Sequence, residues 1–287
     1  MEYTLNCNGR LLSLDMPQVM GILNVTPDSF YAASRQQTEQ AIAQRVHQIL
    51  DEGGSIIDVG ACSTRPDSQP ATEQEEQERL RQALAVVRRE APTAVVSVDT
   101  FRPDVARMAV EEYGADIIND VGVNGQWSMV NGQWSMVNGQ WSMVNGQLPM
   151  FRMVSRLRIP YIYMSRKATM EDVLLDCAEA VDTLRAMGQQ DIVLDPGFGF
   201  GKTLEQNYEV IGQLERMQML RLPVLVGISR KSMIYRLLGT EPAAALNGTT
   251  VLNTLALMKG AAILRVHDVR EAVEAVKLVA AGAATII

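Results

Sequence analysis

Eight short apolar runs rich in Val and Ile recur along the chain, and each is followed by a polar stretch with helical spacing. The runs lie at 19–26, 55–60, 94–99, 115–120, 160–164, 191–195, 223–229 and 261–266. Continuously apolar strands that alternate with helices are typical of a parallel sheet that is buried on both faces. Eight such units favour a closed barrel over an open sheet. The sequence therefore predicts an α/β fold in which residues 1–287 form a single (β/α)8 TIM barrel domain.

The segments between and before these runs fit the same architecture. Helical spacing is clearest at 37–52, 72–90, 103–113 and 268–281. Near the N-terminus, the sequence TLNCNGRLLSL predicts two short strands around Asn8-Gly9, because Asn-Gly favours the tight turns of hairpins. We expect this hairpin to plug the bottom of the barrel.

The net charge and the cysteines limit the kinds of protein and partner that fit this chain. A formal net charge of -7 argues against a nucleic-acid partner and against a polybasic membrane anchor. Cys7, Cys62 and Cys177 form no CxxC pair, a pattern typical of reduced thiols in the cytoplasm. The sequence shows no secretory signal pattern, and no apolar stretch reaches the ~18 residues of a membrane span. We expect a cytoplasmic protein with small-molecule partners.

Polar residues stand at the ends of most of the predicted strands. They are Asn24, Asp58, Asp99, Asn119, Asp195, Ser229 and Arg265. Active sites of barrels are built at the carboxyl ends of the strands, where such side chains come together. One strand-end Asp is more often structural than catalytic, but seven polar strand ends in one chain favour a functional site.

The loops that follow these strands carry groups suited to a flat, anionic substrate. Asn24 offers an amide oxygen for Mg²⁺ or for a hydrogen-bonded ligand, although a turn-forming Asn has the same pattern. Arg65 lies beside two hydroxyls in the segment 63–66, a combination that suits a carboxylate or another anion. The segment DPGFGFGK at 195–202 interleaves aromatic rings with glycines, which allow a ligand to approach the backbone closely.

The last two predicted strands end in SRKS at 229–232 and RVHD at 265–268. Their cations and hydroxyls converge where barrels commonly bind phosphate, and His267 is a candidate anion ligand there. The sequence contains no catalytic triad, HExxH motif or Cys/His metal set. The site therefore suits a heteroaromatic substrate with a diphosphate, and catalysis by positioning and by stabilising the leaving group.

Taken together, seven motifs resemble the dihydropteroate synthase family, in its order and over residues 18–280. They are MGILNVTPDSF, IIDVGACSTRP, SVDT, IIND, LDPGFGFGK, LVGISRKS and LRVHDV. The resemblance implies a transferase of folate biosynthesis that condenses 6-hydroxymethyl-7,8-dihydropterin diphosphate with p-aminobenzoate. The products would be 7,8-dihydropteroate and diphosphate, and the family's reaction is dissociative, through a carbocation on the pterin methylene.

The resemblance also implies roles for individual residues. The pterin would be held by Asp99, Asn119, Asp195 and Lys231, with Met164 in its pocket. The diphosphate would be held by Arg265 and His267, together with Asn24 and Mg²⁺. The p-aminobenzoate and sulfonamide site would be shaped by Thr64, Arg65, Pro66, Phe200 and Ser232. The catalytic set would be Asn24, Asp99, Lys231, Arg265 and His267, in a protein expected to form a homodimer.

Three loops depart from the family pattern. The first loop reads SFYAAS at 29–34 where the family usually continues SFSDGG, so an Asp and two glycines are missing. Cys62 stands where many members carry Glu. After the fifth predicted strand the chain reads MSRKAT at 164–169 in place of MHMxGxP, which leaves open what forms the pterin wall beyond Met164.

The largest departure is an insertion of three copies of WSMVNGQ at 127–147, after the fourth predicted strand. A coiled coil is disfavoured, because a Gly in every heptad costs ~1 kcal/mol relative to Ala. The alternatives are an irregular loop, which we favour, and a β-meander of QWSMV strands joined by Asn-Gly turns. A meander would need something to cover its apolar face.

Two rival functions stay open on the sequence. A pterin-binding methyltransferase-type barrel would share the fold and the pterin site, but would not need an arylamine site or an anion site. A chain with an intact barrel and impaired turnover would bind the pterin without releasing diphosphate.

Overall fold

A barrel of eight parallel strands forms the centre of the chain in the computed structural model, which describes residues 3–25, 35–62, 71–122, 128–130, 133–135 and 149–284. The strands are β3 (Gln18–Asn24), β4 (Ile56–Gly60), β5 (Val95–Asp99), β6 (Ile117–Asp120), β9 (Tyr161–Met164), β10 (Ile192–Asp195), β11 (Leu225–Val226) and β12 (Ile263–Val266). Their order is β10-β9-β6-β5-β4-β3-β12-β11. A parallel bridge between Leu194 and Val224 joins the two ends of this sheet and closes the barrel. The predicted barrel is confirmed, with one strand in each of the eight apolar runs.

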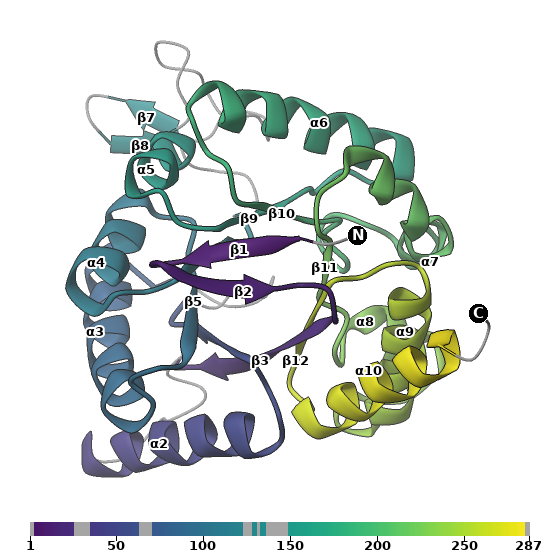
Figure 1. Cartoon of the computed structure of the whole chain (residues 1–287), viewed down its shortest axis with the longest axis horizontal. Coiled ribbons are helices and arrows are strands. Elements are labelled where there is room, and N and C mark those ends of the chain that lie inside the picture. Colours follow the sequence, from purple (N-terminus) through teal and green to yellow (C-terminus); the bar gives the residue numbers. More distant parts are fainter. Residues whose placement is uncertain are drawn as a thin grey trace.

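Helices surround the barrel as an outer ring (Figure 1). They are α2 (Arg35–Asp51), α3 (Glu73–Glu90), α4 (Pro103–Tyr113), α5 (Pro149–Leu157), α6 (Met170–Ala186), α7 (Leu204–Gly212), α8 (Ser232–Leu237), α9 (Leu246–Met258) and α10 (Val269–Ala284), with short 3-10 helices η1 (Leu214–Leu220) and η2 (Pro242–Ala244). The four helices expected from spacing are confirmed. Local sequence fixes where α3 begins, because Thr72 and Glu75 form a capping box. In the described part of the chain, no helix has the length and apolar character to cross a membrane.

Alternation along the strands divides the inside of the barrel into two halves. Side chains near the strand starts form one buried apolar cluster, which includes Met20, Ile56, Ile117, Ile162, Val193, Leu225 and Ile263. Successive strand residues point to opposite faces, so the next inward positions lie two residues further along. On β4, β6, β10 and β12 these positions are Asp58, Asn119, Asp195 and Arg265. The barrel is therefore apolar at the bottom and polar toward the carboxyl ends of its strands.

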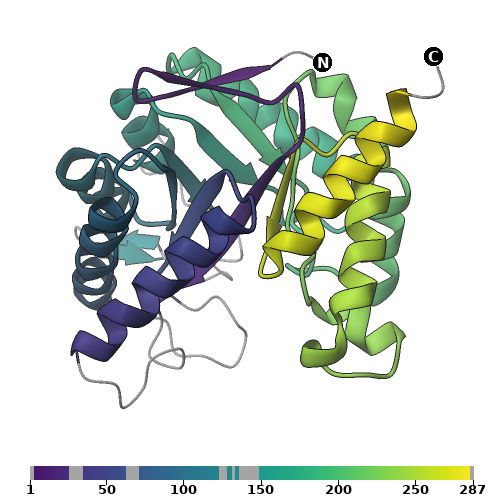
Figure 2. The same ribbon diagram turned by 60° about the horizontal axis from the view of Figure 1, so that its bottom comes forward.

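The N-terminal hairpin closes the bottom of the barrel. Strands β1 (Thr4–Cys7) and β2 (Arg10–Ser13) pair antiparallel, and Asn8 and Gly9 have φ of 53° and 83° as a type I′ turn requires. Leu5 and Cys7 join the apolar cluster at the strand starts. Figure 2 shows the hairpin lying across that end of the barrel, so the expected plug is confirmed.

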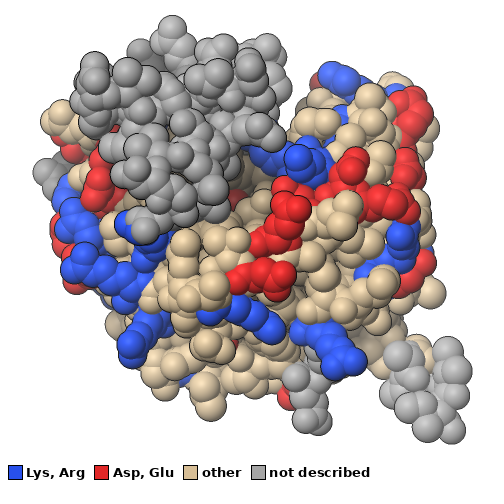
Figure 3. All heavy atoms as spheres, turned by 90° about the horizontal axis from the view of Figure 1, so that it is seen from above, with Lys and Arg blue, Asp and Glu red and all other residues tan. Residues whose placement is uncertain are grey.

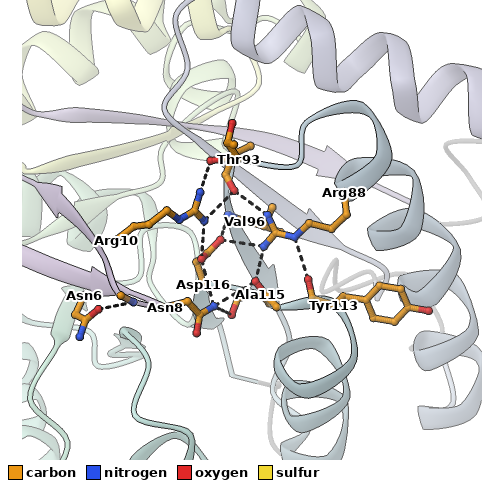
Figure 4. Close-up of polar contacts among 12 residues, drawn as sticks. Asn6, Asn8, Arg10, Arg88, Thr93, Val96, Tyr113, Ala115 and Asp116 are labelled. Atoms are coloured by element: carbon orange, nitrogen blue, oxygen red, sulfur yellow. Dashed lines mark hydrogen bonds and ion pairs between the residues drawn. The ribbon is translucent and has the colours of Figure 1, made fainter.

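A polar network fastens the hairpin to the barrel (Figure 4). Arg10 of the hairpin and Arg88 of α3 both pair with the buried carboxylate of Asp116, at 2.9 and 3.0 Å. The same carboxylate accepts the backbone N–H of Val96 at 2.9 Å and an amide N–H of Asn8 at 3.3 Å. Both oxygens of Asp116 are therefore bonded, which offsets the cost of burying its charge.

Two short strands lie within the inserted repeat. Strands β7 (Ser128–Val130) and β8 (Gln133–Ser135) pair antiparallel, with Val130 opposite Gln133. Two residues separate them, which is the register that the β-meander alternative predicts for its first hairpin. Residues 136–148 lie outside the described part of the chain, so the meander as a whole stays a prediction.

Candidate active site

An ion-pair network crosses the barrel at the carboxyl ends of its strands. The guanidinium of Arg265 on β12 donates from Nε to Asp58 on β4 at 2.6 Å and from Nη2 to Asp99 on β5 at 2.7 Å. The Asn119 amide on β6 also donates to Asp58, at 3.2 Å. Asp58 and Asn119 are completely buried. Burial raises the pKa of Asp99 to about 7, against the effect of Arg265 and with a contribution from the charge of Asp58.

Two oxygens of this network lack a protein partner. They are Asp58 Oδ1 and Asn119 Oδ1, both buried. A buried acceptor that stays unbonded costs about 1–3 kcal/mol, so native structures almost always pair such atoms. A ligand that presents N–H groups to the inside of the barrel would satisfy both oxygens.

Asp195 and Lys231 form a second polar group beside the network. Asp195 at the end of β10 accepts the backbone N–H of Gly197 at 2.7 Å. Burial raises its pKa, and the positive charge of Lys231 opposes that shift. The Lys231 ammonium donates to the carbonyl of Phe198 and lies 4.5 Å from the centroid of the Phe200 ring. Burial lowers the pKa of Lys231 to about 8.

The loop after β10 depends on a glycine at one position. Gly197 has φ of 71°, and a Cβ atom there would lie 2.0 Å from the carbonyl oxygen of Ser165. Only glycine permits this close approach. Two walls of the candidate site are thereby brought into contact, namely the loop of DPGFGFGK and the end of β9, where Met164 is buried.

The anion side of the site contains His267, just after β12. Its Nδ1 lies 3.1 Å from Ser229 Oγ, and its backbone N–H donates to the same oxygen at 3.1 Å. Desolvation and the charge of Arg265 lower the pKa of His267 to about 4. A neutral ring that accepts the Ser229 hydroxyl at Nδ1 carries its proton on Nε2, where it can donate to an anion.

Arg230 corrects the expectation that all cations of the SRKS segment serve the anion. Its guanidinium forms a two-bond ion pair with Asp268, at 2.8 and 2.9 Å. It also donates to the carbonyls of Pro242 and Ala243. These contacts occupy the N–H groups of the Arg230 guanidinium and fix the loop between β11 and α8.

The other predicted residues that the structure describes also lie at or after the carboxyl ends of strands. Asn24 is exposed at the end of β3, and a Cβ atom on Gly60 would lie 3.4 Å from both Asn24 Oδ1 and Asp99 Cβ. Ser232 begins α8 directly after Lys231. Thr64, Arg65, Pro66 and residues 26–34 of the first loop lie outside the described residues.

Two further residues belong to the site although the sequence did not single them out for a role. In the sequence, Asp58 is only one of several strand-end carboxylates. The register of the barrel is what places its side chain inside. Arg166 follows β9, with its guanidinium carbon 5.8 Å from the centroid of Phe200 and its Nη1 buried without a partner. No signal in the sequence distinguished it from a surface arginine.

The fold and the site together define a barrel enzyme with unpaired buried hydrogen-bond acceptors at the carboxyl ends of its strands. Consistent with this class, the profile of the family described as "Pterin binding enzyme" matches residues 20–267. The chain belongs to this family.

Similar proteins within the family are dihydropteroate synthases. That of Clostridium beijerinckii is 35% identical over 269 residues, covering 91% of this chain and 92% of the relative. That of Escherichia coli K12 is 33% identical over 273 residues, covering 95% and 94%. Two solved structures of the Xanthomonas albilineans dihydropteroate synthase are also similar. The complex with 4-aminobenzoic acid has a TM-score of 0.84 at 33% identity and 99% coverage of both chains. The complex with 7,8-dihydropteroate has a TM-score of 0.82 at 32% identity, covering 98% of this chain and 99% of the other.

Proposed function

We propose that the chain is a transferase that condenses 6-hydroxymethyl-7,8-dihydropterin diphosphate with p-aminobenzoate, giving 7,8-dihydropteroate and diphosphate in folate biosynthesis. The observation that carries this proposal is the pairing of two features at one end of the barrel. Buried acceptors on Asp58, Asn119 and Asp195 suit the N–H edges of a pterin. Lys231, whose charge acts on Asp195, suits the pterin side. The cation Arg265, with His267 as a neutral donor, suits the diphosphate.

Asp195 accepts hydrogen bonds from the amino and ring N–H groups of the pterin. Asn119 forms hydrogen bonds with the opposite edge of the pterin ring. Met164 packs against the ring from the end of β9. Arg265 lies between the two halves of the bound substrate. Its guanidinium holds Asp58 and Asp99 on the pterin side and faces the diphosphate on the other side.

The reaction follows from the charge that this arrangement stabilises. The bond between the pterin methylene and the diphosphate oxygen breaks, and its electron pair leaves with the diphosphate. Lys231, Arg265 and His267 stabilise the departing charge, as preorganised donors do in other enzymes. The amino nitrogen of p-aminobenzoate then attacks the methylene carbocation and loses a proton. Phe200 and Ser232, with Thr64, Arg65 and Pro66, bind the arylamine in this proposal, and sulfonamides would compete there.

Mg²⁺ fits the site as an ion that arrives with the diphosphate. Among the described residues, no three His, Cys, Asp or Glu side chains form a metal cluster. Mg²⁺ commonly keeps several waters and binds through one or two protein oxygens together with substrate phosphates. The exposed amide oxygen of Asn24 beside Asp99 suits that role. When bound, the ion would neutralise charge on the leaving diphosphate.

We further propose that the protein is a cytoplasmic homodimer. Large apolar side chains are exposed on three helices that lie next to one another, α8, α9 and α10. They are Leu237, Val251, Met258 and Leu278, and Leu238 directly after α8 is exposed as well. Exposed apolar patches of this kind mark association surfaces. On the face drawn in Figure 3, acidic side chains of the described residues form a band, with basic side chains on either side of it.

The test is to mix the purified protein with dihydropterin diphosphate, p-aminobenzoate and Mg²⁺, and to follow dihydropteroate and diphosphate together. The proposal expects both products in equal amounts. Methyl transfer from a pterin donor without diphosphate release would favour the methyltransferase alternative. Pterin binding without either product would identify a barrel with impaired turnover.

A further inference from the structure

The two strands that lead to Asn24 and His267 stop pairing with each other before they reach these residues. Strands β3 and β12 run parallel, and the last partners in their register are Gly21 and Val266. Asn24 and His267 both lie beyond these partners. The ladder between β3 and β12 therefore does not by itself fix how far apart the two residues stand.

Each of the two strand ends is held on its other side. Asn24 lies opposite Gly60 of β4 in the register, and the next residue of β3 donates its backbone N–H to the Gly60 carbonyl at 2.8 Å. The backbone N–H of His267 donates to Ser229 Oγ at 3.1 Å. What remains to be set is the spacing across the junction between β3 and β12.

Arg45 of α2 bridges this junction. Its Nε donates to the carbonyl of Ile22 at 3.1 Å, and its Nη2 donates to the carbonyl of His267 at 2.7 Å. Helix α2 lies beside β3 (Figures 1 and 2), so the side chain reaches both strand ends from outside the barrel. A guanidinium holds its N–H groups in a rigid, planar fork. One arginine therefore sets the distance between two carbonyls that belong to different strands.

The remaining nitrogen of Arg45 also has a protein partner. Its Nη1 donates to Gln48 Oε1 on the same helix at 2.9 Å. Since all three guanidinium nitrogens donate to groups of the protein, Arg45 can act on a substrate only through the strand ends that it holds.

We propose that Arg45 is a positioning residue for the diphosphate side of the site, because it sets the spacing between the strand ends that carry Asn24 and His267. The inference rests on the proposed function, in which His267 donates to the diphosphate and Asn24 faces the ion that accompanies it. The pterin side does not depend on Arg45, since Asp195 and Lys231 are held by contacts with the loop after β10.

The experiment separates positioning from charge. Arg45→Lys keeps the positive charge but replaces the forked group by a single ammonium, whereas Arg45→Met removes the charge as well. Arg79→Lys is the matched control, because Arg79 of α3 also donates to a carbonyl just after a strand, that of Ala61, at 3.2 Å. Calorimetric titration measures the affinity for two ligands. They are dihydropterin diphosphate with Mg²⁺, and 6-hydroxymethyl-7,8-dihydropterin, which lacks the diphosphate.

We expect both Arg45 variants to bind dihydropterin diphosphate about tenfold more weakly than wild type, the effect of losing one hydrogen bond from a charged donor. Their affinity for 6-hydroxymethyl-7,8-dihydropterin should stay within about twofold of wild type, because the pterin contacts are distant from Arg45. Arg79→Lys should bind both ligands as wild type does. If Arg45→Met does not fold, Arg45→Lys carries the test.

A second readout needs no ligand. The chain contains two histidines, His47 and His267, so NMR can follow the ring of His267 with His47 as an internal reference. His47 contacts Glu90 of α3 at 3.1 Å and takes no part in the junction. We expect Arg45→Lys to shift the ring signals of His267 and to leave those of His47 in place.

The outcomes distinguish this proposal from the proposed function. A wild-type protein that makes no dihydropteroate contradicts the proposed function, while the His267 signals and the binding of the diphosphate ligand still test Arg45. Folded Arg45 variants with unchanged affinity for dihydropterin diphosphate overturn the positioning role. Normal affinity in Arg45→Lys with weak binding in Arg45→Met also overturns it, since that result indicates a long-range effect of charge. An equal loss of affinity for both ligands does the same, because it indicates general loosening of the barrel.

Discussion

Each end of the barrel contains an ion-pair network, and the two networks have opposite charge arrangements. At the bottom, the single carboxylate of Asp116 lies between Arg10 and Arg88, and both of its oxygens are bonded. At the top, the single guanidinium of Arg265 lies between Asp58 and Asp99, and one oxygen of Asp58 has no partner. Satisfied buried polar groups fix a structure, whereas unsatisfied ones are costly unless a ligand completes them. The bottom network therefore serves stability, and the top network serves binding.

The largest effect is expected from breaking the bottom network. Asp116→Ala leaves two arginines without their shared carboxylate and should lower the free energy of unfolding by about 3 kcal/mol, toward the lower end for a broken buried pair because Arg10 is partly exposed. Urea denaturation measures this change. The folded variant should bind dihydropterin diphosphate as wild type does. A variant of normal stability that has lost the substrate would reverse the assignment of the two ends.

Breaking the top network should affect binding more than folding. Arg265→Ala should weaken binding of dihydropterin diphosphate by about 2–5 kcal/mol, the range for truncating one partner of a buried charge pair. Calorimetric titration gives the value, with Arg10→Ala as the control at the other end of the barrel. Unchanged affinity in Arg265→Ala would remove this residue from the site.

Binding at the top of the barrel should also depend on pH. Burial lowers the pKa of Lys231 to about 8, so its ammonium is present below that pH and is lost as the pH rises through it. Affinity for dihydropterin diphosphate should therefore fall above pH 8, by up to about tenfold per pH unit. Lys231→Arg should flatten the profile, because guanidinium stays protonated. Lys202, whose pKa burial also lowers to about 8, provides the control Lys202→Arg, which should keep the wild-type slope.

The smallest effect is expected from the inserted repeat. Removing residues 127–147 should leave thermal stability nearly unchanged, because each doubling of loop length costs only about 0.6 kcal/mol in closure entropy. Affinity for the pterin should not fall, since WSMVNGQ contains no charge for a diphosphate. Thermal denaturation and calorimetry of the deletion variant measure both quantities. Failure to fold would show that the repeat is an integrated element and would favour the β-meander.

The sequence was sufficient to predict the barrel, because each apolar run carries its own signal. It also predicted that polar strand ends would gather on one side, as Asp99, Asn119 and Arg265 do. It could not predict which of them pair, because Arg265 and Asp58 are 207 residues apart and only the closed register brings them together. The pairing of Arg230 with Asp268 was hidden for the same reason. The roles of Thr64, Arg65 and Pro66 stay predictions.

The most direct test of the division between the two ends is a crystal structure of the protein with dihydropterin diphosphate. We predict that the ring lies at the carboxyl ends of the strands, with its N–H groups bonded to Asp195 and Asn119 and its diphosphate near Arg265 and His267. The network around Asp116 should be unchanged. A ligand bound away from Asp195 and Asn119, with Asp58 Oδ1 and Asn119 Oδ1 still without hydrogen-bond partners, would contradict the account.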